Sequence, residues 1–178
     1  MKKRVAWKAR LAWELGRPEK LAVLGVGNIA KGDDAAGIRA AEGLAGLAGP
    51  TRRLKVFVTH EVPENFTGAV REFEPTHVLI IDAAAAGFRP GGIFIVDPAA
   101  VPDEDVSTHR TPLSTLTGYL ERTVGCRVVM LGIEPADFAA GAPLSPPVRH
   151  AVERVAAFLA GFVSRRLRSS SASGRKYS

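Results

Sequence analysis

Apolar residues along this chain occur with two different spacings. Unbroken apolar runs bounded by turn residues are typical of buried strands, and they predict strands at 21–26, 55–59, 77–82, 93–96 and 127–133. Between these runs the apolar residues recur every three or four positions, which predicts helices over 38–47, 63–72, 112–123 and 146–167. This alternation predicts an α/β fold with three αβα layers around a twisted, mostly parallel five-stranded sheet.

The predicted strand 93–96 differs from the others in how the chain reaches it. A Gly- and Pro-rich loop precedes it, and this loop is shorter than the crossover of about a dozen residues that a parallel neighbour needs. We therefore expect one antiparallel strand, at an edge of the sheet.

The two ends of the chain are basic and its middle is not. Residues 1–20 hold seven Lys or Arg and two Glu, and residues 164–178 hold five Lys or Arg and no acid, so a total charge of +6 leaves 21–163 at −4. We predict a basic amphipathic segment at 1–20 that lies on the body or on a partner, a single α/β domain at 21–163, and a basic, Ser-rich, disordered tail at 164–178. Because the body is acidic, we expect no nucleic-acid partner.

Several classes of protein are disfavoured by simple counts. No apolar run approaches the roughly 20 residues that a membrane span needs, and charges interrupt the N-terminal segment. We therefore expect a cytoplasmic protein. We also expect a monomer. The lone Cys126 excludes a disulfide framework and a thiolate metal site, and its place at the start of a strand indicates an inert, packed thiol.

A glycine-rich turn joins the first strand to the first helix of the domain and delivers Asp33 and Asp34 to the helix start. Gly25, Gly27 and Ala30 fit the looser form of the dinucleotide fingerprint. Two carboxylates at the helix N-terminus would repel a pyrophosphate, and no acid follows at the expected spacing of about 20 residues, so this alternative is disfavoured. We expect Asp33 to cap the helix and Asp34 to be available for binding.

Three residues are candidates for chemistry at the carboxyl edge of the sheet, where open α/β sheets bind ligands. Asp34 follows the first strand, Asp82 ends the central strand, and His109 lies in a loop that could fold back over the same edge. Two carboxylates and one imidazole suit a divalent metal with an open position. Asp82 could instead brace a loop, and His109 could bind a backbone carbonyl.

An ordered series of motifs resembles the hydrogenase maturation endopeptidases, closest to the branch that serves hydrogenases of the formate hydrogenlyase type. These proteases trim the C-terminal extension from the large subunit of nickel-iron hydrogenases. The similarity covers about 21–162, and its motifs are Gly25-Val26-Gly27-Asn28, Gly32-Asp33-Asp34, Pro63-Glu64-Asn65, Ile81-Asp82-Ala83, Pro90-Gly91-Gly92, Asp97-Pro98, Thr108-His109, Pro112-Leu113 and Leu131-Gly132-Ile133-Glu134-Pro135. Ala35 stands where many relatives have Gly.

The resemblance implies a twisted mixed sheet and a metal-contacting trio at Asp34, Asp82 and His109. It also implies a hydrogenase large-subunit precursor as substrate, with nickel carried by that substrate, while zinc or cadmium could occupy the same site. Two mechanisms stay open, a metal-activated water and an aspartic pair acting as acid and base. The sequence contains neither a nucleophile elbow nor an H-E-x-x-H motif. A non-catalytic nickel checkpoint or chaperone is the alternative function.

Overall fold

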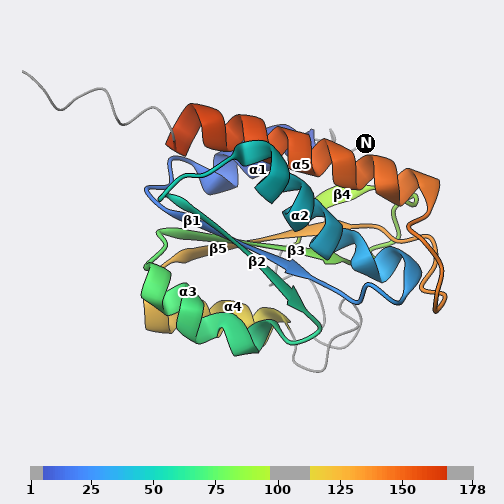
Figure 1. The fold of residues 1–178 in the computed structure, drawn as a ribbon, viewed down its shortest axis with the longest axis horizontal. Helices are drawn as coiled ribbons and strands as arrows, with labels where there is room; N and C mark the ends of the chain where they lie inside the picture. Colours follow the sequence, from blue (N-terminus) through green and yellow to red (C-terminus); the bar gives the residue numbers. More distant parts are fainter. Residues whose placement is uncertain (1–5, 97–112, 168–178) are drawn as a thin grey trace, which may run out of the picture.

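The computed structural model describes residues 6–96 and 113–167. A five-stranded sheet lies between two layers of helices (Figure 1). The elements in chain order are α1 (Trp7–Leu15), β1 (Leu21–Val26), η1 (Gly32–Ala35), α2 (Ala36–Ala48), β2 (Leu54–His60), η2 (Pro63–Phe66), α3 (Thr67–Phe73), β3 (His77–Ala83), β4 (Ile93–Val96), α4 (Leu113–Val124), β5 (Arg127–Ile133) and α5 (Pro146–Leu167), where η marks a 3₁₀ turn.

The strand order is β2-β1-β3-β5-β4, and every neighbouring pair is parallel except β4 with β5. β4 runs antiparallel at the edge, with Ile93 opposite Ile133. The predicted α/β fold with one antiparallel edge strand is confirmed. The parallel strands all end at one edge, the carboxyl edge, so the loops that follow β1, β2, β3 and β5 meet there.

Alternating side chains of the strands supply two apolar cores, one on each face of the sheet. On β3, Leu79 and Ile81 join the core under α1, α2 and α5, whereas Val78 and Ile80 join the core that α3 and α4 cover (Figure 1). Since all four of these side chains are buried, β3 is the central strand that its apolar run predicted.

The N-terminal helix α1 packs into the first of these cores. Leu11 and Leu15 are fully buried there, and the Trp7 ring meets Phe158 of α5 edge-on at 5.2 Å. At the other end of the chain, α5 continues to Leu167, which is also buried. Within the described residues, no helix combines the length and the apolar character required to cross a membrane.

One predicted helix, 63–72, begins differently from the expectation. It opens with the 3₁₀ turn η2, with Pro63 in its first turn, and becomes α-helical only at Thr67, whose hydroxyl donates to the Glu64 carbonyl at 2.9 Å. Apolar spacing does not distinguish these two helix types over a single turn.

Candidate active site

The turn that carries Asp34 is packed too tightly to accept side chains at two of its glycines. Gly27 has φ +141°, and a Cβ there would overlap the Asp34 carbonyl, while Gly32 has φ +50°. The Asn28 amide donates to the same Asp34 carbonyl at 3.3 Å, and the Asn28 side chain accepts from Ala30 at 2.8 Å. The backbone of Asp34 is therefore held against the end of β1, and the residue is only 1% exposed.

The first turn of α2 rests directly on the ends of β1 and β3. A Cβ at Gly37 would overlap the carbonyl oxygens of both Val26 and Ile81. Ile81 immediately precedes Asp82, which is 3% exposed. The structure thus brings the segment that carries Asp34 against the end of the strand that carries Asp82, as the sequence predicted for the carboxyl edge.

Asp82 faces the layer of α3 and α4, because strand residues alternate and Ile81 faces the opposite core. Its partner across the β3–β5 pair is Gly132, which has no side chain. The ring of Phe94 lies over Gly132, where a Cβ would collide with it. One wall beside Asp82 is therefore an aromatic ring rather than a polar group.

Asp33 does not cap the helix, so that expectation was wrong. The residue before η1 is Lys31, and its side chain makes no capping hydrogen bond. The carboxylate of Asp33 is turned instead toward the segment 136–145. Its Oδ2 accepts from the Ala136 amide at 2.8 Å, the Asp137 amide at 3.1 Å and the Ser145 hydroxyl at 2.8 Å, and its Oδ1 accepts from the Ser145 amide at 2.7 Å.

Glu134 is a fourth buried carboxylate, and sequence reasoning did not single it out. It is 6% exposed, and its Oε2 accepts from the amides of Ala86 at 2.8 Å and Phe88 at 3.1 Å. Its backbone also pairs with Gly91 and Gly92. The available signal was an acid directly after a buried strand, the same signal that identified Asp82.

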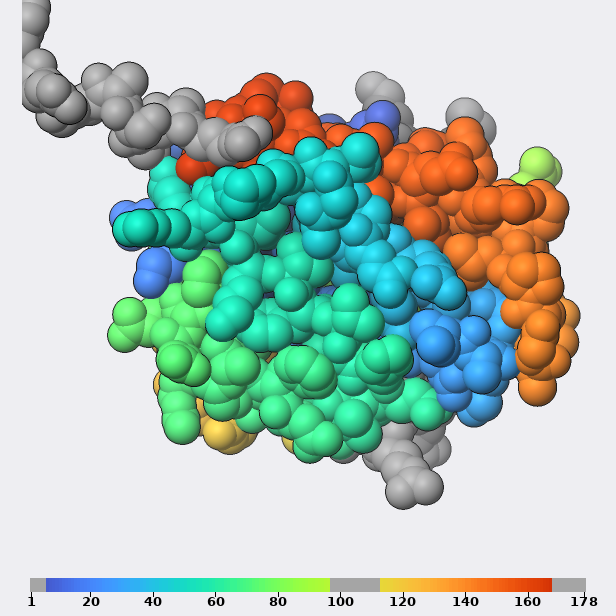
Figure 2. Space-filling view, viewed as in Figure 1, coloured from blue at the N-terminus to red at the C-terminus, as the bar shows by residue number. Residues whose placement is uncertain are grey.

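These contacts join the loops of the carboxyl edge to one another. An isolated bridge pairs Lys31 with Ala140, and the Gly141 amide donates to the Ala30 carbonyl at 2.8 Å. Lys31 Nζ also lies 3.7 Å from Oε1 of Glu61, the residue that follows β2. Figure 2 shows the result, with the segment between β5 and α5 (orange) lying against the turn after β1 (blue).

The third predicted site residue, His109, lies outside the described residues, as does the Asp97-Pro98 motif. In the part of the chain that the structure describes, no group of three or more His, Cys, Asp or Glu side chains is arranged to hold a metal ion. The metal trio of Asp34, Asp82 and His109 therefore stays a prediction.

His77 and Cys126 lie away from the carboxyl ends of the strands. His77 lies at the start of β3, where burial and the nearby Arg127 lower its pKa, and its Nδ1 lies 3.0 Å from the Thr76 hydroxyl. His150 is exposed on α5. Cys126 is buried with its Sγ 3.7 Å from the Leu120 carbonyl, and burial raises the pKa of the thiol, which confirms a packed cysteine.

Comparisons of sequence and of structure lead to the same family. A family model described as hydrogenase maturation protease matches residues 38–161, a range that contains Asp82 and His109 and begins after Asp34. The chain is 38% identical over 141 residues to the hydrogenase 3 maturation protease of Escherichia coli K12, covering 79% of this chain and 88% of that protein.

Solved structures give the same result. A NiFe hydrogenase maturation protease from Thermococcus kodakarensis KOD1 matches with a TM-score of 0.81 at 29% identity, over 87% of this chain and 99% of that one. The solution structure of the endopeptidase HycI from Escherichia coli matches with a TM-score of 0.70 at 37% identity, over 80% of this chain and 90% of that one.

Proposed function

This chain belongs to the hydrogenase maturation protease family, and we propose that it removes the C-terminal extension of a nickel-iron hydrogenase large-subunit precursor after nickel has been inserted. The observation that carries the proposal is the pair of buried carboxyl residues, Asp34 and Asp82, on adjacent elements at the carboxyl edge of the sheet. Open α/β sheets bind their ligands at this edge.

We propose that the enzyme recognises the nickel that its substrate carries. Asp34 and Asp82 supply oxygen ligands and His109 supplies a nitrogen, a donor set that suits a divalent ion and leaves a position open. Docking on the nickel holds the adjacent peptide bond beside the two carboxyl groups, and such positioning removes much of the entropic barrier. Zinc or cadmium fits the same donor set.

The water that cleaves the peptide bond is activated in one of two ways. In the first, the metal that the three residues grasp lowers the pKa of the water and polarises the scissile carbonyl. In the second, Asp34 and Asp82 divide the roles of base and acid, as in aspartic peptidases. Their burial favours a strong interaction with either a metal or a proton, because charges interact more strongly where water is excluded.

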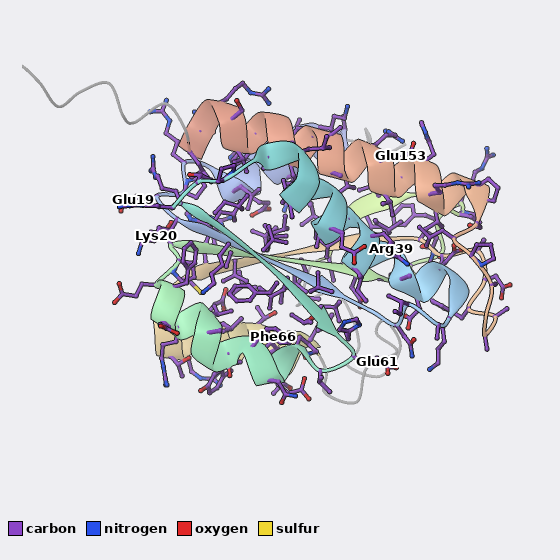
Figure 3. The ribbon with its side chains drawn as sticks, in the orientation of Figure 1. Glu19, Lys20, Arg39, Glu61, Phe66 and Glu153 are labelled. Atoms are coloured by element: carbon purple, nitrogen blue, oxygen red, sulfur yellow. The ribbon has the colours of Figure 1, made fainter. Side chains whose placement is uncertain are left out.

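The decisive experiment incubates the full-length protein with nickel-loaded precursor and weighs the products by mass spectrometry. We expect a shortened large subunit and a released C-terminal peptide, and no cleavage of nickel-free precursor. Glu153→Ala, a change of an exposed residue on α5 (Figure 3), is the matched control and should cleave normally. An intact precursor that stays bound to the protein would instead identify a checkpoint or chaperone.

The dinucleotide alternative makes a different prediction. A nucleotide-binding protein would be stabilised against heat by NAD, whereas the proposed site predicts stabilisation by nickel, zinc or cadmium. We expect a rise in Tm with the metal ions and none with NAD. We also place the processing step in the cytoplasm and expect the enzyme to act as a monomer.

A further inference from the structure

We propose that Asp33 is a positioning residue, whose carboxylate fastens the segment 136–145 to the turn of Asp34 and thereby fixes where Asp34 meets the substrate. The proposal rests on the function proposed above, since it assigns a task to a neighbour of the predicted catalytic residue. It concerns a buried acid that the proposed chemistry does not itself use.

The Asp33 side chain accepts four hydrogen bonds. Both carboxylate oxygens are occupied, by three backbone amides and one hydroxyl, all between 2.7 and 3.1 Å. The donors come from residues 103 to 112 positions later in the chain. Asp33 is 1% exposed, so water does not replace these bonds if they are lost.

The turn around Asp33 is held on both sides, so a displacement of Asp33 also moves Asp34. The Asp33 amide donates to the Asp137 carbonyl at 3.0 Å, so backbone and side chain are held by the same segment. On the other side, Gly27 and Asn28 press against the Asp34 carbonyl. Asp33 and Asp34 share a peptide bond, with Cα atoms about 3.8 Å apart, so a shift of one moves the other.

Asp33 differs from an ordinary structural acid in what its hydrogen bonds hold in place. Loosening the segment 136–145 leaves the buried residues of both apolar cores in place, because none of them belongs to that segment and only the partly buried Leu144 packs against one of the cores. What it does release is the turn beside the predicted reacting pair. A misplacement of about 1 Å near a reacting group can cost about 10²-fold in rate.

The test compares Asp33→Asn with the unchanged full-length protein. The amide keeps the shape of the side chain but replaces one acceptor oxygen with a donor, which opposes at least one of the amides that now donate to it. We expect kcat for cleavage of nickel-loaded precursor to fall about 10²-fold while KM changes little. Ser145→Ala removes one of the four hydrogen bonds and should lower kcat about fivefold.

Leu15→Ala serves as the control for general destabilisation. Leu15 is fully buried at the opposite end of the molecule, at the close of α1, so its truncation lowers Tm without touching the turn. With both variants folded at the assay temperature, Leu15→Ala should keep its kcat. If Asp33→Asn loses no more activity than Leu15→Ala, the acid is merely structural and the proposal is overturned.

Hydrogen exchange separates this inference from the proposed function. Asp33→Asn should raise amide exchange in residues 27–37 and 134–145 and leave the core strands unchanged. Unchanged exchange in those two segments overturns the proposal whether or not the protein cleaves its substrate. Failure of the unchanged protein to cleave its substrate would instead count against the proposed function. The hydrogen-exchange result does not depend on cleavage, so the two failures can be told apart.

Discussion

The two edges of the sheet differ in how many acidic residues they bury. At the carboxyl edge, the acids Asp33, Asp34, Asp82 and Glu134 are all at most 6% exposed. At the amino edge, most charges are exposed: Lys20 Nζ lies 4.0 Å from Glu74 Oε2, and the guanidinium groups of Arg10 and Arg127 both contact the ring of Trp13, which is 69% exposed. Figure 3 labels Glu19 and Lys20 at the amino edge and Glu61 at the opposite edge.

The difference in burial indicates which charged residues affect function. Burying a carboxylate costs free energy unless hydrogen bonds or partners compensate, whereas an exposed ion pair contributes about 1 kcal/mol or less. Asp33 and Glu134 accept hydrogen bonds from loop amides, which compensate for their burial. A cost of this kind is retained where a site needs it, so changes at the carboxyl edge should affect activity and changes at the amino edge should not.

The largest expected effect is on the predicted trio. Asp34→Ala, Asp82→Ala and His109→Ala should each lower the cleavage rate about 10³-fold or more, within the range that loss of an acid–base group produces. Circular dichroism should show a retained fold. Measuring cleavage by mass spectrometry decides the matter, and full activity of Asp82→Ala would remove the trio from the mechanism.

The next effect is on stability and depends on the close approach of α2 to the sheet. Gly37→Ala should lower the free energy of unfolding by about 3 kcal/mol, since the new methyl group overlaps the Val26 and Ile81 carbonyls. Urea unfolding measures the change.

The matched control lies in the same helix. A Cβ at Gly46 meets no atom within 4 Å, so Gly46→Ala should raise the free energy of unfolding by about 0.5 to 1 kcal/mol through helix propensity. Equal effects of the two substitutions would contradict the close packing that places Asp34 beside β3.

At the amino edge the expected effects are smaller. Glu14, whose side chain is 12% exposed, pairs with Arg10 at 2.7 Å and also with Arg127. Glu14→Gln should lower the free energy of unfolding by about 1 kcal/mol and leave cleavage unchanged. The loss should shrink only slightly in high salt, because salt screens a pair with one largely buried side chain much less than an exposed pair. A marked loss of activity would show that the two edges are not independent.

The smallest effect is a pH dependence from His77. Burial, and then the charge of Arg127, lowers its pKa from the usual 6.5 in the folded state. Above that pH the residue is neutral in both states. Below it the unfolded chain binds the proton first, so the free energy of unfolding falls as the pH drops below 6.5. Urea titrations at pH 7.5 and pH 5.5 should show a smaller drop for His77→Gln.

Most of the fold was predictable because its signals are local. The strands at 21–26, 93–96 and 127–133 have the predicted bounds, since each is an apolar run closed by turn residues. The antiparallel edge strand followed from the length of one loop. Asp82 and Asp34 were predictable as residues of the carboxyl edge, because parallel strands fix which loops share that edge.

The role of Asp33 was not predictable in the same way. An aspartate at the start of a helix is often an N-cap, and the residues next to Asp33 in the sequence favour that interpretation. Its true partners are more than 100 positions away, so only the folded chain reveals them. The partners of Glu134 were likewise hidden, since the amides of Ala86 and Phe88 are 48 and 46 positions distant, although its place directly after a strand was a local signal.

The order of synthesis adds a consequence. Both acids of the predicted site are encoded in the first half of the chain, yet β5 must insert between β3 and β4, and Ser145 must arrive before Asp33 is fastened. A ribosome that has released only the first 125 residues has therefore made Asp34 and Asp82 without the frame that buries them. A nascent chain therefore completes its predicted active site only when translation is nearly finished.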